Sequence, residues 1–150
     1  YKLYLMKKLL LLLLFIPLIS FGQNENTKKN EKESLIPFAT IEDVPLFPGC
    51  ETVPKSKRRD CFQNKMNRHI IQNFRYPEFA QKNGIQGRVF VQFIIGKDGN
   101  ISDIRSRGPH GSLERAAERI IEKLPKMTPG YTNGLPVRVP FSIPITFNLR

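Results

Sequence analysis

The closing stretch "RVPFSIPITFNLR" constrains the fold more than any other part of the chain. Apolar residues fall at every second position from 137 to 149 and more polar ones lie between them, which is the period of a strand with one buried face. Pro140 and Pro144 interrupt this pattern, and proline lacks the N–H that a sheet ladder needs. A strand with two missing donors can lie only where those donors are not used.

The spacing of the two prolines predicts an edge strand. The N–H and C=O of one residue point to the same side of a strand, and that side alternates from residue to residue. Pro140 and Pro144 both have even numbers, so their missing donors lie along one edge, while the odd residues can pair with a neighbouring strand. Two interpretations of the open edge follow. The prolines protect it against aggregation, or its second half accepts an added peptide strand.

The first 22 residues have the pattern of a secretory signal peptide. Lys7 and Lys8 precede an apolar run over residues 9–19, and a short stretch with small residues, "SFGQ", follows. The run is shorter than the about 20 residues that cross a bilayer, so we expect export, with an uncleaved anchor as the alternative. Loss of residues 1–22 removes three lysines and lowers the formal net charge from +11 to +8. Such a charge favours anionic surfaces.

Cys50 and Cys61 are the only cysteines in the chain. In an exported protein we expect them to form a disulfide, which is worth up to about 3 kcal/mol for a loop of this size. Two reduced, half-buried thiols are the alternative. The chain has two histidines, His69 and His110. Four residues at wide spacing make a poor metal site, so we expect neither a metal nor a cofactor.

Composition divides the chain into four parts. After the signal peptide, residues 23–40 are expected to be a disordered linker, because "QNENTKKNEKES" holds no apolar residue. Residues 41–59 are expected to be an extended segment, since its prolines forbid a helix and its apolar residues can pack onto a core. The domain is expected over residues 60–150. Asp60 is the expected N-cap of its first helix, with Gln63 as the capping-box partner.

The elements of the domain follow in the order helix, hairpin, helix, strand. A short helix is expected between Tyr76-Pro77 and Asn83-Gly84, then a strand from Gly87, the Asp98-Gly99 turn and a returning strand. Ser112 is the expected cap of the next helix, and a loop leads from it to the final strand. This order predicts an α+β fold in which two main helices pack on one face of a three-stranded antiparallel sheet.

No combination of acid, base and nucleophile stands out, so we expect a binding module with no catalytic residues. A hydrolase that acts through His110 or Cys61 is kept as a third class. The basic run over residues 55–59 is short and lacks interleaved aromatics, which argues against nucleic acid as a partner.

Three stretches resemble the TonB C-terminal domain: "YPEFAQKNGIQGRVFVQFIIGKDGNI", "LERAAERIIEKLPKMTPG" and "NGLPVRVPFSIPITF". The stretch "VPLFPGCE" is also similar to a lead segment in TonB-like proteins of Bacteroidetes-type bacteria. The resemblance covers roughly residues 60–150. Its motifs are Tyr76-Pro77 with Ala80, the alternation after Gly87, Asp98-Gly99, Leu124-Pro125 with Pro129-Gly130, and Val137 to Phe147.

The resemblance implies a periplasmic domain that binds the TonB box, a short peptide at the plug of outer-membrane transporters for siderophores, vitamin B12 and glycans. The box adds as a strand to the last strand of the domain, in a role linked to energy-dependent transport. An inner-membrane, proton-driven motor is a further partner if the N-terminus is retained as an anchor. An open edge strand also permits a homodimer. The expected partner-binding residues are Ser142, Ile145, Thr146, Phe147, Asn148, Leu149 and Arg150.

The chain departs from full-length family members in having a cleavable-looking signal and a short linker, where those have a spanning helix and a long spacer. The alternative function is therefore a structural interaction module of the cell envelope, with a protein or peptidoglycan partner and no energy transduction. Salt separates the two hypotheses, because charge-led binding weakens with ionic strength while backbone pairing does not.

Overall fold

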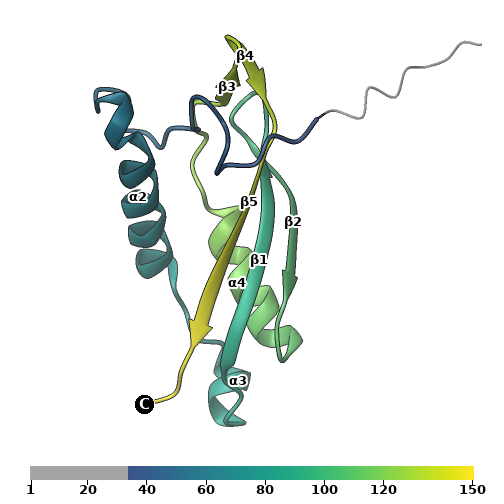
Figure 1. The fold of residues 1–150 in the computed structure, drawn as a ribbon. Coiled ribbons are helices and arrows are strands. Elements are labelled where there is room, and N and C mark those ends of the chain that lie inside the picture. Colours follow the sequence, from purple (N-terminus) through teal and green to yellow (C-terminus); the bar gives the residue numbers. More distant parts are fainter. Residues whose placement is uncertain (1–33) are drawn as a thin grey trace, which may run out of the picture. The chain divides into compact units, whose positions relative to one another are not determined.

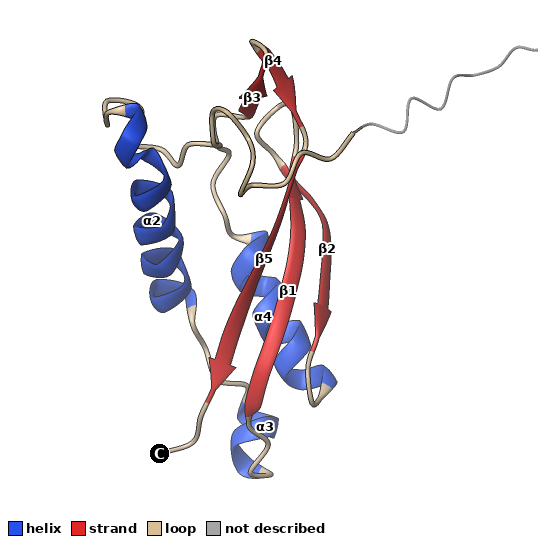
Figure 2. Cartoon of the chain, viewed as in Figure 1, coloured by secondary structure: helices blue, strands red, loops and turns tan. Residues whose placement is uncertain are grey.

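The computed structural model describes residues 34–150, so the expected signal peptide and most of the expected linker lie outside the described residues. Figures 1 and 2 show helices and strands arranged around one long, twisted sheet. The elements in chain order are η1 (Lys55–Lys57), α2 (Arg58–Asn73), α3 (Glu78–Lys82), β1 (Gly87–Ile95), β2 (Ile101–Arg107), α4 (Gly111–Glu122), β3 (Gly130–Thr132), β4 (Leu135–Val137) and β5 (Val139–Phe147).

The main sheet has the strand order β2-β1-β5, and both pairs of neighbours are antiparallel. This confirms the α+β fold with a three-stranded antiparallel sheet. β1 lies in the centre and buries Val89, Val91, Phe93 and Ile95 on one face, as its alternation predicts. β5 pairs with β1 over its whole length, from Val139 opposite Ile95 to Phe147 opposite Gly87.

The two main helices cover the apolar face of the sheet. α4 packs on β1 and β2 and buries a broad stripe that includes Leu113, Ala117 and Ile121. α2 buries Phe62 and Met66 and reaches α4 through a hydrogen bond of 2.8 Å between His69 Nε2 and the carbonyl oxygen of Ile120. In Figure 1, α4 lies behind the sheet and α2 stands beside β5. The opposite face of the sheet carries no helix of the described chain.

Both predicted helix caps are wrong. α2 begins at Arg58, so Asp60 lies inside its first turn, and no side chain caps the helix. The cap of α4 is His110, whose Nδ1 accepts the backbone N–H of Ser112 at 3.1 Å. Asp60 still lies where a carboxylate favours the helix dipole. An imidazole nitrogen can accept the same hydrogen bond as a hydroxyl, so His110 can serve as the cap. Ser112, the more usual type of cap residue, is then the second residue of the helix.

The loop before the final strand contains a hairpin that the sequence analysis missed. β3 and β4 pair through a turn at Asn133 and Gly134, with φ values of +51° and +73°. Asn-Gly is the preferred pair for such a turn, so the signal was present in the sequence. The hairpin takes Val137 into β4, and β5 begins only after Arg138.

The segment before α2 is well packed, but the expected extended stretch of residues 41–59 ends in turns, in η1 and in the first two residues of α2. Ile41, Val44, Leu46 and Phe47 are all buried, as predicted. Backbone hydrogen bonds join this segment to the loop after α4, including the pair between Leu46 and Thr128. The predicted disulfide between Cys50 and Cys61 is confirmed, with the Cα atoms 6.1 Å apart. It joins the extended segment to α2.

Candidate functional site

β5 is an edge strand. Within the described residues β1 is its only neighbour in the sheet. The odd-numbered side chains of β5 are buried, whereas those of Ser142, Pro144 and Thr146 are exposed. Because proline has no N–H, the even residues cannot be the ones that donate to β1, and their backbone groups point to the open edge. This edge therefore offers the N–H groups of Ser142 and Thr146.

The first part of this edge is covered by the chain itself. Ile36 donates its N–H to the carbonyl oxygen of Arg138 at 3.0 Å, and Leu35 forms a parallel bridge with the same residue. Phe38 packs on Phe62 and Phe141, with ring centroids 4.8 and 5.1 Å away. We call residues 35–38 the strap. Part of the expected linker thus lies on the domain, and the open edge starts at the beginning of β5.

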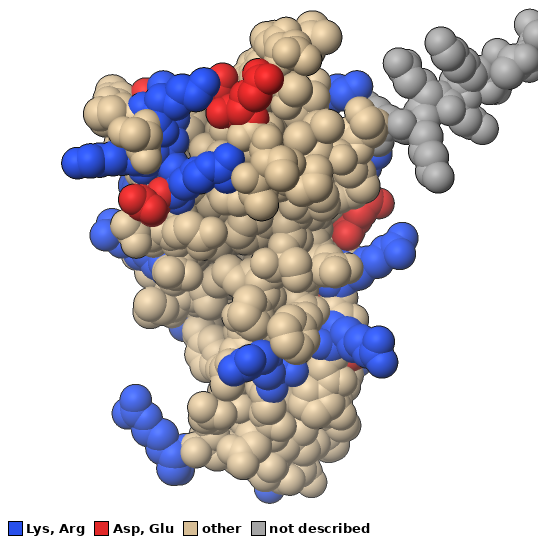
Figure 3. All heavy atoms as spheres, viewed as in Figure 1, with Lys and Arg blue, Asp and Glu red and all other residues tan. Residues whose placement is uncertain are grey.

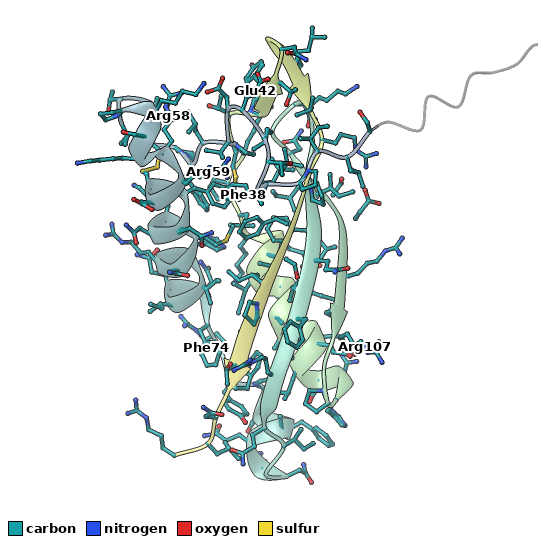
Figure 4. All side chains as sticks on the ribbon, viewed as in Figure 1. Phe38, Glu42, Arg58, Arg59, Phe74 and Arg107 are labelled. Carbon is teal, nitrogen blue, oxygen red and sulfur yellow. A yellow bond between two sulfur atoms is a disulfide. The ribbon has the colours of Figure 1, made fainter. Side chains whose placement is uncertain are left out.

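Arg59 of α2 holds the strap in place. Its guanidinium donates to the carbonyl oxygens of Phe38 and Ile41, the latter at 2.8 Å. Its Cζ also lies 5.3 Å from the centre of the Phe38 ring. Figure 4 shows Arg59 and Phe38 close together between α2 and the sheet. A guanidinium with several fixed donors suits this double contact better than an ammonium would.

A groove of about 540 Å³ runs between the second half of α2 and the open part of β5. Its walls are largely apolar, and on the α2 side Ile71 is 75% exposed. The lining residues are Asn67, Ile70, Ile71 and Phe74 from α2 and Ile143, Pro144, Ile145 and Thr146 from β5. A strand placed along β5 would have alternate side chains directed at this groove.

The far end of β5 is anchored by aromatic contacts. Phe147 is fully buried and packs on Phe74 and Tyr76, with ring centroids 4.9 and 5.6 Å away. The Tyr76 hydroxyl donates to the carbonyl oxygen of Ile85 at 2.6 Å. Beyond the strand, the N–H of Leu149 donates to Gln86 Oε1 at 3.2 Å. The groove thus ends at a packed aromatic cluster.

The structure places the seven expected partner-binding residues in three settings. Ser142 and Thr146 lie on the open edge. Ile145 and Phe147 pair with β1 through their backbones and bury their side chains in the core, so they contribute to the shape of the site through packing. Asn148, Leu149 and Arg150 follow the end of β5.

The helix side of the groove was not predicted from the sequence. Ile71 is a large apolar residue outside the apolar face of α2, and this position could have predicted an exposed apolar contact. No sequence pattern marked Asn67 as part of the groove.

The residues considered for chemistry have structural partners. Cys61 is in the disulfide, and a disulfide sulfur is not a resting nucleophile. His110 caps α4 and stacks on Phe79 at 5.7 Å. The pKa of Asp98 is lowered, chiefly because its carboxylate accepts the backbone N–H of Asn100, and this bond belongs to the turn between β1 and β2. Residues 34–150 contain no group of three or more His, Cys, Asp or Glu side chains that could hold a metal.

The fold and the site define a small α+β interaction domain with an open strand edge and an apolar groove beside it. The family model for the C-terminal domain of the Gram-negative bacterial TonB protein matches residues 72–149. That is more than half of the chain, so the chain belongs to the TonB C-terminal domain family. This family acts in energy-coupled transport, is associated with the cell envelope and interacts in general with outer-membrane TonB-dependent transporters.

Two solution NMR structures of the Helicobacter pylori TonB C-terminal domain are similar to this chain. One is 29% identical, with 67% of this chain and 87% of that chain covered and a TM-score of 0.49. The other is 31% identical, with 58% and 92% covered and a TM-score of 0.44. No curated protein matches the chain. No helix within residues 34–150 is long and apolar enough to cross a membrane.

Proposed function

We propose that this domain binds the TonB box of an outer-membrane transporter by strand addition to β5, in the periplasm, and takes part in energy-dependent transport. The observation that carries the proposal is the combination of an open edge at Ser142 and Thr146 with an apolar groove beside it. Main-chain hydrogen bonds to an edge supply affinity, and side-chain pockets beside it supply selectivity.

The geometry limits the peptide that fits. The strap occupies the carbonyl of Arg138, so an added strand can pair from about Pro140 to the end of β5. One side of that strand would face α2 and the other would face solvent. The matching peptide is a short extended segment whose apolar side chains fall at alternate positions.

The test is a pair of substitutions at Thr146. Thr146→Pro removes the N–H that an added strand needs, while Thr146→Ala keeps it. Because Thr146 does not donate to β1 and its side chain is exposed, both variants are expected to fold. The N–H is worth about 1 kcal/mol net and the proline ring blocks approach of the strand, so binding to Thr146→Pro should weaken at least about tenfold.

The measurement is titration of ¹⁵N-labelled residues 23–150, which contain the compact unit Glu31–Arg150, with TonB-box peptides from transporters of the same organism. Amide shifts along residues 142–150 that persist at high salt are expected for the wild type and for Thr146→Ala. Tight binding by a folded Thr146→Pro variant would place the site elsewhere. Shifts that vanish at high salt would support charge-led binding to another envelope partner.

A further inference from the structure

The face of the sheet opposite the helices carries an exposed aromatic ring among arginines. Phe90, in the middle of β1, is 51% exposed. Arg107 of β2 lies directly opposite it, and Arg88 is two positions away on the same strand and the same face. Arg105 lies opposite Gln92, one step further along. We call Phe90 with Arg88, Arg105 and Arg107 the arginine face.

Register places these four side chains close together. Neighbouring strands lie about 4.8 Å apart, and residues i and i+2 of one strand about 7 Å apart. The three arginines therefore flank Phe90 along β1 and on the β2 side, and Pro144 of β5 lies on its other side. Figure 3 shows Lys and Arg on both sides of an uncharged strip over the lower half of this face.

The three arginines of this face are exposed, and within residues 34–150 they make no hydrogen bond or ion pair with another side chain. Nearby acids are used elsewhere. Glu118 accepts from Ser106 on the helix side of β2, and Asp103 pairs with Arg138 at 3.0 Å. The acidic residues of α4 therefore do not neutralise the arginine face. Its positive charge is available to a partner.

We propose that the arginine face docks the domain on a bilayer surface that contains anionic lipids. Guanidinium groups match lipid phosphates because they donate two parallel hydrogen bonds. The exposed phenyl ring beside them can enter the boundary between head groups and acyl chains, where the apolar side chains of interfacial segments, Phe included, are buried. An exposed aromatic side chain with neighbouring arginines on a sheet face fits an anionic bilayer surface better than it fits an extended peptide, which needs an edge or a groove.

The arginine face borders the open edge of β5, but the two proposals are tested at different groups, because Arg88, Arg105 and Arg107 lie on β1 and β2 and the N–H of Thr146 lies on β5. Pro144 and Thr146 are the cross-strand partners of Phe90 and Arg88 and share their face, while the free backbone groups of β5 point away from β1 in the plane of the sheet. A domain held on the bilayer by its sheet face would keep its edge and groove accessible to a peptide.

The test compares two triple variants of residues 23–150 with the same net charge. One is Arg88→Gln, Arg105→Gln and Arg107→Gln. The control is Arg68→Gln, Arg115→Gln and Arg119→Gln, which removes three exposed arginines from α2 and α4. Co-sedimentation uses neutral phosphatidylcholine vesicles and vesicles in which phosphatidylglycerol replaces a third of that lipid. Circular dichroism checks that each variant is folded.

The wild type and the control should bind the anionic vesicles and not the neutral ones. Each arginine near such a surface contributes about fivefold in affinity, so the first variant should bind on the order of a hundredfold more weakly. Equal loss in both triple variants would show that net charge alone drives binding and would overturn the proposal. Binding to purified peptidoglycan sacculi with no binding to vesicles would overturn it as well.

A second measurement tests whether the side chain at position 90 contacts the bilayer. The chain contains no tryptophan, so Phe90→Trp introduces a single fluorescent reporter at the centre of the face. Its emission should shift to shorter wavelength with anionic vesicles and stay unchanged with neutral ones. Vesicle binding without any shift would show that another surface makes the contact.

Discussion

At the scale of single residues, the turn between β1 and β2 shows how one glycine supports the packing of a distant loop. Gly99 has a φ of +81°, and its carbonyl oxygen accepts the N–H of Met127 at 3.0 Å. A Cβ placed on Gly99 would lie 1.7 Å from the carbonyl oxygen of Met127. The Asp98-Gly99 pair therefore does more than reverse the chain, because the loop after α4 packs directly on its backbone.

Gly99→Ala should be among the most destabilising single substitutions in the domain. The positive φ costs about 1–2 kcal/mol for alanine, and displacement of Met127 adds about 1–3 kcal/mol. Gly84→Ala is the matched control, since Gly84 has a φ of +65° and nothing within 4 Å of the added Cβ. Urea unfolding should separate the two variants. Equal losses would mean that the contact with Met127 is easily relieved.

At the scale of elements, one part of α2 packs in the core and another part lines the groove beside β5. Phe62 and Met66 belong to the core, while Ile71 projects beside the open edge of β5. A single exposed apolar side chain is ordinary, but Ile71 continues the apolar wall that Ile70 and Phe74 form along the groove. The proposed added strand would lie next to β5 on this side.

Ile71→Ser should weaken peptide binding about tenfold and change the free energy of unfolding by less than about 0.5 kcal/mol, because the side chain is exposed until a peptide covers it. Gln63→Ser, on α2 but outside the groove, is the control and should leave affinity unchanged. Peptide titration and urea unfolding of both variants make the comparison. A large loss of stability in Ile71→Ser would instead assign this residue to the core.

At the scale of the whole molecule, the extended segment before α2 is part of the domain. It pairs with the loop after α4, its apolar residues are buried and its end is joined to α2 by the disulfide. The strap continues it to the edge of β5, where it ends the open stretch at Arg138. The length of the proposed peptide site is thus set by a segment far from it in sequence.

Replacing both cysteines, Cys50→Ala with Cys61→Ala, should lower the free energy of unfolding by about 3 kcal/mol, as expected for a closed loop of this size. The open part of the β5 edge should still bind peptide, because β1 and α2 hold it independently. Urea unfolding and the peptide titration give the two readouts. Unchanged stability would show that the packing of the segment, and not its covalent link, holds it in place.

Local patterns in the sequence predicted much of the fold. Alternation over residues 87–95, the stripe of α4 and the Asp98-Gly99 turn each depend on neighbours in the chain, and each forms as expected. The final strand also forms, but over Val139–Phe147 only, because Val137 belongs to β4. The two helix caps and the hairpin at Asn133-Gly134 are also local, but their signals competed with commoner alternatives. His110 in place of Ser112 is an example.

The sequence by itself determined that the last strand has one edge without donors at Pro140 and Pro144, because the side to which a backbone group points depends only on residue parity. Only the tertiary structure decided what lies along that edge. The strap at Arg138, the groove under Ile71 and the arginine face around Phe90 each join residues from separate elements. Such groupings depend on how helices and strands pack, and no period in the sequence records that.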